Sequence, residues 1–168
     1  GVSVRMNDMH DEPWPDSHMF PAFYRNHPEL RLANPGRLGW GGQGFNYERP
    51  EVRAHYLSLL GELITGYDFD FLELDFLRFT QYFPRPVTGA SRSILTAFLR
   101  EIRALIKRAG RPIALLPRVA STPGAALEQG CDPLAWAREG LIDGLIVGMF
   151  IGTGWDYPVA AFREQVGD

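Results

Sequence analysis

The stretch that decides the fold of this chain is residues 69–78, which read Phe69-Asp70-Phe71-Leu72-Glu73-Leu74-Asp75-Phe76-Leu77-Arg78. Side chains alternate between two faces along a β-strand. One predicted face carries Phe71, Glu73, Asp75 and Leu77, and the other carries Leu72, Leu74, Phe76 and Arg78. The second face is predicted to pack against helices. Burying carboxylates is costly unless they are paired or hydrogen-bonded, so Glu73 and Asp75 on the first face need a functional or structural reason.

Outward from this strand, strands and helices follow one another in turn. We predict strands at 2–6, 70–76, 112–117 and 142–150, and helices at 50–66, 91–109, 133–140 and from 158 onward. This order implies right-handed crossovers and a parallel sheet. A small doubly wound domain is the alternative, but no glycine-rich phosphate turn directly follows any of the predicted strands.

The length of the chain favours a partial barrel. A closed (β/α)8 barrel takes about 250 residues, and this chain has 168. We therefore predict an α/β fold of the partial TIM-barrel type, with about four βα units in a single domain over 1–168. The chain begins at Gly1 and enters a strand at once, so we expect an excerpt of a longer sequence. Its localisation stays open, with a secreted or periplasmic protein as one possibility.

Composition narrows the classes of partner. The net charge is −3 and the pI is near 5.8, which does not favour a nucleic-acid-binding protein with its basic patch. No apolar run approaches the ~20 residues of a membrane span. The single cysteine, Cys131, cannot form an intramolecular disulfide. We expect no nucleic-acid partner and no membrane partner, and the oligomeric state is not predicted.

A long loop at 9–49 is predicted between the first strand and the first long helix. Loops of more than about 12–15 residues without secondary structure are usually functional or disordered, and this one is too rich in aromatic residues for disorder. Trp14 and Trp40 lie in it, and Trp155 lies in the loop after the fourth strand. We expect these three tryptophans to contribute to substrate binding.

Polar residues gather where the predicted strands end. Asn7, Asp8 and His10 follow the first strand, Arg78 follows the second, and Arg118 closes the third. We expect them to orient a substrate, although Arg118 could instead form a structural ion pair with Glu73 or Asp75. The Asp8–His10 segment lacks a second histidine at metal-ligand spacing. No metal and no cofactor are therefore predicted.

Four segments carry a resemblance to a known family, namely residues 4–11, 49–53, 67–78 and 136–143. With these segments the chain resembles the glycoside-hydrolase-like (β/α)8 barrels, and in particular the uncharacterised bacterial glycosyl hydrolase-like family 10 type proteins. The resemblance covers most of the chain. It implies a barrel with carbohydrate chemistry and a carbohydrate substrate. In the large retaining clan of such hydrolases, the acid follows the fourth strand and the nucleophile follows the seventh.

The leading hypothesis is a glycoside hydrolase that cleaves O-glycosidic bonds of a poly- or oligosaccharide by carboxylate acid/base catalysis. Asp75 is the expected general acid/base, with Glu73 one layer deeper as the second catalytic candidate. The partner carboxylate would lie outside this chain. Two alternatives stay open: a non-catalytic carbohydrate-binding barrel, and a metal-dependent hydrolase that uses Asp8, His10 and Asp75.

Overall fold

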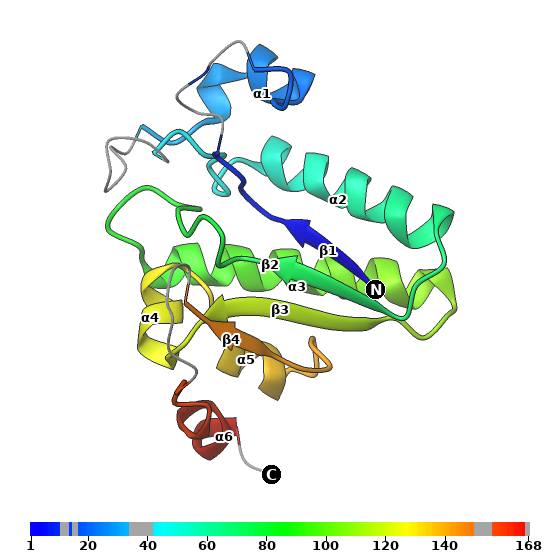
Figure 1. Ribbon diagram of the computed structural model, residues 1–168, viewed down its shortest axis with the longest axis vertical. Helices are drawn as coiled ribbons and strands as arrows, with labels where there is room; N and C mark the ends of the chain where they lie inside the picture. The colour runs from blue at the N-terminus through cyan, green and yellow to red at the C-terminus, as the bar shows by residue number, and fades with distance from the viewer. Residues whose placement is uncertain (11–13, 15–16, 34–41, 150–155, 167–168) are drawn as a thin grey trace.

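The computed structural model describes residues 1–10, 14, 17–33, 42–149 and 156–166. At its centre lies a four-stranded sheet in the order β1-β2-β3-β4, with every neighbouring pair parallel (Figure 1). The strands are β1 (Val2–Arg5), β2 (Phe71–Asp75), β3 (Ala114–Ala120) and β4 (Ile146–Gly148). Sequential strands are spatial neighbours, so the order lacks the reversal that marks a doubly wound sheet. The predicted α/β class with a parallel sheet is confirmed.

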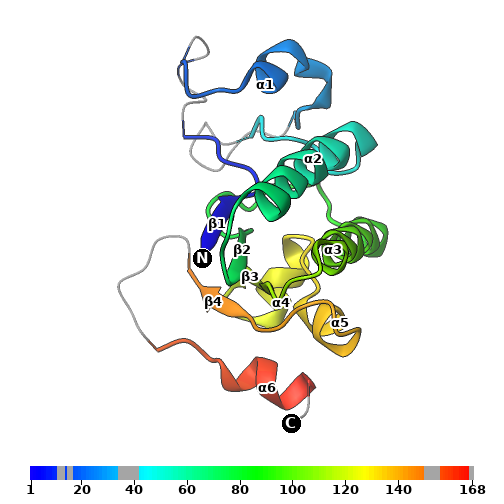
Figure 2. The same cartoon turned by 90° about the vertical axis from the view of Figure 1, so that its right-hand side faces the viewer.

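Helices connect the strands along one side of the sheet. They are α2 (Pro50–Gly66), α3 (Gly89–Ala109), α4 (Pro123–Glu128) and α5 (Pro133–Arg138), and α6 (Ala160–Val166) packs against α5. Figure 2 shows α2, α3, α4 and α5 on the same face of the sheet. No helix in the described part of the chain is both long enough and apolar enough to cross a membrane.

Local sequence explains where these helices begin. Proline occupies the first helical position of α2, α4 and α5, where its fixed φ is favourable and its missing N–H costs nothing. Helix α3 begins with a capping box, in which Thr88 Oγ1 accepts the Ser91 N–H and Ser91 Oγ accepts the Thr88 N–H. The helix ends at Gly110, whose φ of 69° is left-handed.

The core lies between the sheet and this helical layer. Its fully buried members include Leu72, Leu74 and Leu115 from the sheet, Leu60 and Ile64 from α2, Phe98 and Ile102 from α3, Cys131 before α5, and Trp136 within it. The Trp136 indole Nε1 donates to Thr96 Oγ1 at 3.0 Å, so the one polar atom of this large side chain is satisfied.

The opposite face of the sheet is not covered by these four helices (Figure 2). Phe71 is 37% exposed there, and Glu73, Leu116 and Ile146 are half-buried. Parallel sheets normally have both faces buried. The alternation predicted for 71–75 therefore holds, with the apolar side toward the helices and the carboxylate side away from them.

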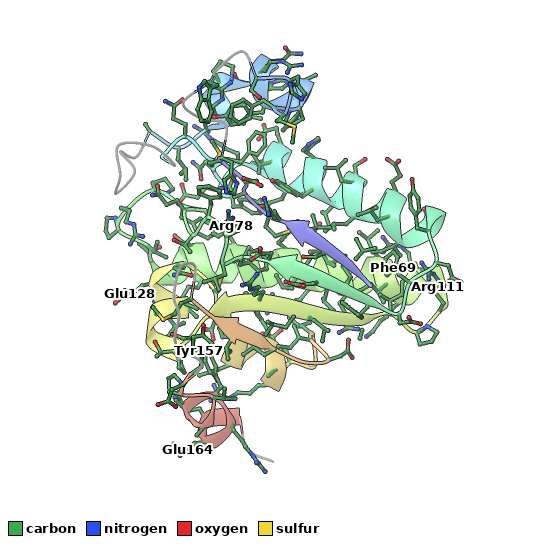
Figure 3. The ribbon with its side chains drawn as sticks, in the orientation of Figure 1. Phe69, Arg78, Arg111, Glu128, Tyr157 and Glu164 are labelled. Carbon is green, nitrogen blue, oxygen red and sulfur yellow. The ribbon has the colours of Figure 1, made fainter. Side chains whose placement is uncertain are left out.

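Arg111 joins the amino-terminal ends of the strands. Its guanidinium donates to Asp68 Oδ1 at 3.0 Å and to the carbonyls of Ile64, Tyr67 and Phe69. It thereby fixes the end of α2 and the start of β2 beside β3. Figure 3 shows Arg111 and Phe69 at the opposite end of the sheet from Arg78.

Several sequence-based boundaries were wrong. The predicted loop at 9–49 contains secondary structure: helix α1 (Ala22–Asn26), the 3-10 turn η1 (Pro28–Leu30) and an antiparallel bridge between Arg31 and Phe45. Strand β3 extends to Ala120, so Arg118 lies within it rather than at its end. Helix α4 was not predicted, and its cap, Thr122 Oγ1 accepting from Ala125 N, is a signal that could have revealed it.

Candidate functional site

Three charged residues form a row across adjacent strands, at the last residues of β1 and β2 and at Arg118 near the end of β3. Arg5 on β1 is the register partner of Asp75 on β2, and Asp75 is the partner of Arg118 on β3. Register partners share a face of the sheet, and this is the face that the helices leave uncovered. In open and closed α/β folds alike, ligands bind at the carboxyl ends of the strands. The row is therefore the starting point of the candidate site.

Asp75 is almost fully buried, with 4% of its surface exposed. Its Oδ1 accepts the backbone N–H groups of Leu77 at 3.0 Å and Arg78 at 3.1 Å. Its Oδ2 lies 3.7 Å from Arg118 Nη1. Oδ1 therefore stabilises the turn that ends β2. Oδ2 faces the Arg118 guanidinium and is the oxygen that could contact a substrate.

This turn overrides the alternation predicted beyond Asp75. Phe76 and Leu77 are both buried, at 0% and 2% exposed, although they were predicted to lie on opposite faces. Arg78, which strict alternation would place on the face of Leu72 and Leu74, contacts His10 after the turn. The physical reason is that an aspartate that accepts two following N–H groups bends the backbone out of the extended conformation.

Glu73 lies two residues before Asp75 on the same face and is half-buried. Its register partners are Ser3 and Leu116. Among the described residues it has no ion-pair partner within 4.0 Å. Glu73 therefore lies nearer the amino-terminal end of β2 than Asp75 and is the more exposed of the two carboxylates.

A second polar group, at the end of β1, links Arg5, Asp8, His10 and Arg78. Asp8 accepts from Arg5 Nη1 through Oδ2 and pairs with His10 Nδ1 through Oδ1, both at 2.5 Å. His10 Nε2 is bonded to Arg78 Nη2. A guanidinium can only donate, so His10 Nε2 accepts from Arg78. The Nδ1–H group then donates a hydrogen bond to Asp8 Oδ1. The Asp8 carboxylate therefore fixes both the tautomer and the orientation of the imidazole.

The charge of Asp8 is stabilised by these contacts. Burial acts to raise the pKa of Asp8, but hydrogen bonds from Arg5 and His10 outweigh it and hold the pKa below the ordinary value. Asp8 is accordingly ionised at neutral pH. It acts as the fixed negative charge between two cationic or donor groups.

A cavity of about 630 Å³ adjoins this polar group. Its lining combines Arg5, Asp8, His10 and Arg78 at one end with a mostly apolar and aromatic wall: Val4, Met9, Met19, Phe20, Pro21, Tyr24, Phe45, Tyr56 and Leu59, together with Asn7 and His55. The wall comes from the segment around α1 and from α2. The aromatic richness of the 9–49 segment was the sequence signal for it, but the contribution of α2 was missed.

Asn7 has a structural position within this edge. It is 2% exposed, its Nδ2 donates to the carbonyls of Phe45 and Gln81, and its Oδ1 accepts the Phe45 N–H at 2.8 Å. One side chain thus joins the end of β1 to two segments about 38 and 74 residues away along the chain. We therefore omit Asn7 from the substrate-contacting set that the sequence predicted.

Of the three tryptophans predicted to bind substrate, only Trp14 lies among the described residues. Trp14 is 64% exposed, as a binding platform requires, whereas Trp40 and Trp155 lie outside the described residues. Arg118 is 39% exposed and reaches Asp75, which matches the ion-pair alternative. Within the described residues, His, Cys, Asp and Glu side chains form no group of three able to hold a metal ion.

The comparisons with known proteins give this site no assignment. No model of a protein family matches the chain. No curated protein matches it either. We therefore infer function from the geometry of the site.

Proposed function

We propose that the chain forms part of a (β/α)8 barrel and that this barrel is a glycoside hydrolase. The support for the barrel is its winding: consecutive parallel strands, with α2 to α5 on a single face. In a closed barrel the helices surround the sheet and the other face turns inward. The face that carries Glu73 and Asp75 would then be the barrel interior.

The observation that carries the catalytic proposal is the row Arg5–Asp75–Arg118 at the carboxyl ends of the strands. Catalytic residues of (β/α)8 enzymes come from the ends of several strands at this edge. Asp75 Oδ2 is the proposed acid/base atom, and Arg118 holds that carboxylate in position from 3.7 Å away. Glu73 supports it from the layer below.

Such a mechanism needs a second carboxylate across the scissile bond. Carboxyl groups about 5–5.5 Å apart give retention of configuration, and a separation of about 6.5–9.5 Å gives inversion. In this proposal Asp75 and the second carboxylate act on opposite sides of the anomeric carbon of an O-glycoside: one protonates the leaving oxygen, and the other attacks the anomeric carbon or activates water. The aromatic wall and Trp14 offer apolar surface to the sugar faces.

A non-catalytic carbohydrate-binding barrel is the second candidate. It is favoured by the use of Asp75 in the fold, since Oδ1 holds the turn and Oδ2 faces Arg118. In that case the row would serve stability and recognition only.

The two candidates are separated by a glycan screen of the purified protein, beside Asp75→Asn and the control Asp70→Asn. The side-chain amide of Asp75→Asn keeps an oxygen for the Leu77 and Arg78 N–H groups, and Asp70 is an exposed residue just before the same strand. We expect Asp75→Asn to lower turnover at least about 100-fold with binding and fold retained, and Asp70→Asn to be unaffected. Full turnover by Asp75→Asn would reject the acid/base assignment. Binding without turnover by the wild type would select the second candidate, and neither binding nor turnover would reject both.

A further inference from the structure

Residues 17–33, here called the α1 segment, form one wall of the cavity beside β1, and helix α2 forms another. The segment contributes Met19, Phe20, Pro21 and Tyr24, and α2 contributes His55, Tyr56 and Leu59. Figures 1 and 2 show α1 beyond the carboxyl end of β1, outside the layer of helices that covers the sheet. Separation of the α1 segment from α2 would therefore widen the cavity.

Aromatic rings hold the α1 segment against α2. The rings of Phe23 and His55 stack nearly parallel, with 11° between their planes and 3.9 Å between their centroids. Phe45 lies beside both rings, at 5.5 Å from Phe23 and 6.3 Å from His55. Helix α1 has only five residues, and isolated helices shorter than about 12–15 residues are marginal in water. Helix α1 therefore depends on this docking to stay helical.

His55 contributes a ring to this contact but has no polar partner. It is half-buried, and among the described residues no carboxylate lies within 4.0 Å of its ring nitrogens and no hydrogen bond reaches them. The charged or titratable groups on the surrounding elements are Glu51, Arg53 and Tyr56 on α2, Arg25, His27, Glu29 and Arg31 on the α1 segment, and Arg5, Asp8, His10 and Arg78 at the polar end of the cavity. A proton on His55 would therefore have no counterion in contact.

Two effects disfavour a positive charge on His55. Burial lowers the pKa of His55, and the charge of His27 lowers it further. The His27 ring lies 4.8 Å from the Phe23 ring, so two histidines flank one phenyl ring, and His27 has its own carboxylate partner in Glu29. The docked state is thus fully favoured above the ordinary histidine pKa of 6.5 and is weakened as the pH falls below it.

We propose that the α1 segment is an acid-sensitive wall of this cavity: protonation of His55 breaks its stack with Phe23, releases α1 from α2 and opens the cavity. The stack is the contact that both elements share, and the proton acts directly on one of its two rings. This device goes beyond the proposed hydrolase activity and does not depend on it, because it concerns access to the cavity rather than the charged row on β1 to β3.

Hydrogen–deuterium exchange of the purified protein, corrected for the intrinsic exchange rate, tests the proposal at about pH 7.5 and about pH 5.5. In the wild type we expect the amides of α1 to lose at least about threefold in protection at the lower pH, whereas the amides of α3 keep theirs. His55→Phe retains a flat ring against Phe23 but takes up no proton, so its α1 should stay protected at both values. His18→Phe, at an exposed position of the same segment, is the matched control and should respond as the wild type does.

Phe23→Ala provides a second measurement that does not depend on pH. Loss of the Phe23 ring should leave α1 unprotected at both pH values, with the protection of α3 unchanged. Normal protection of α1 in Phe23→Ala would overturn the proposal. So would an acid response of His55→Phe equal to that of the wild type, or loss of α3 protection in parallel with α1. Constant or increased protection of the wild-type α1 in acid would also overturn it, since attraction of the imidazolium to the phenyl face would then dominate.

Discussion

The guanidinium of Arg118 lies opposite the carboxylate of Asp75, with 3.7 Å between Nη1 and Oδ2, at paired positions of β3 and β2. The two partners differ in their access to water, since the Asp75 side chain is 5% exposed and that of Arg118 is 39% exposed. The carboxylate therefore depends on the pair more than the guanidinium does, because water can solvate Arg118 but hardly reaches Asp75.

Removal of Arg118 should destabilise the fold through Asp75. We expect Arg118→Met to lower the free energy of unfolding by about 1–2 kcal/mol, because a buried charge loses its counterion but keeps two N–H donors. In an Asp75→Asn background the same substitution should cost much less. Urea denaturation of the four proteins of this cycle measures the coupling, and purely additive effects would show that the pair contributes no energy.

Asn7 should be a stability residue of the carboxyl edge. Asn7→Ala leaves the Phe45 N–H and the carbonyls of Phe45 and Gln81 without their partner. We expect a loss of about 2–3 kcal/mol in unfolding free energy, together with faster amide hydrogen exchange in residues 42–47. Asn26→Ala, at an exposed position at the end of α1, is the control and should change stability little. A loss of ligand binding without any change in stability would contradict this role.

Acid should weaken the fold partly through Asp143. Burial acts to raise the pKa of Asp143, but hydrogen bonds from the Leu115 N–H and Arg103 hold it below the ordinary 3.8. A folded-state pKa below the unfolded value means stability that is present above 3.8 and lost as the pH falls through the folded-state pKa. Asp143→Asn should therefore lose less stability than the wild type over that acid range. Denaturation across a pH series checks this, with the exposed Asp70→Asn expected to track the wild type.

Two glycines at the ends of long helices should respond oppositely to alanine. Gly110 ends α3 with a φ of 69°, so Gly110→Ala should cost about 1 kcal/mol. Gly66 is the last residue of α2, has no positive φ, and an added Cβ would meet nothing within 4 Å. Gly66→Ala should stabilise by about 0.5–1 kcal/mol through the unfolded chain. Thermal unfolding of both variants measures these changes in stability. Equal changes in melting temperature would argue against an effect of the backbone conformation of the two glycines.

The elements with strong local signals were predictable from the sequence. Helix α2 was predicted over the same residues that the structure shows, because Pro50 marks its start and Gly66 its end. The alternation within β2 correctly separated Leu72 and Leu74 from Glu73 and Asp75. These features depend on neighbours in the chain, which a single sequence displays.

The features that could not be predicted from the sequence depend on contacts between segments that are distant in the chain. The hydrogen bonds of Asn7 to Phe45 and Gln81 could not be inferred, since nothing in the sequence around Asn7 indicates those partners. The hydrogen bond between His10 and Arg78 was also not predictable, because it requires the turn that Asp75 forms after β2. The assignment of carbohydrate chemistry came from a resemblance and stays a prediction.

The position of Arg111 has a consequence for how this protein can change over evolutionary time. Its hydrogen bonds tie α2 and β2 together at the end of the sheet away from the charged row. These contacts are thus made at the other end of the sheet from Arg78, one of the residues proposed to contact ligands. Substitutions at Arg5, Arg78 or Arg118 would leave this anchor of α2 and β2 in place, so these positions can vary without loss of the contacts of Arg111.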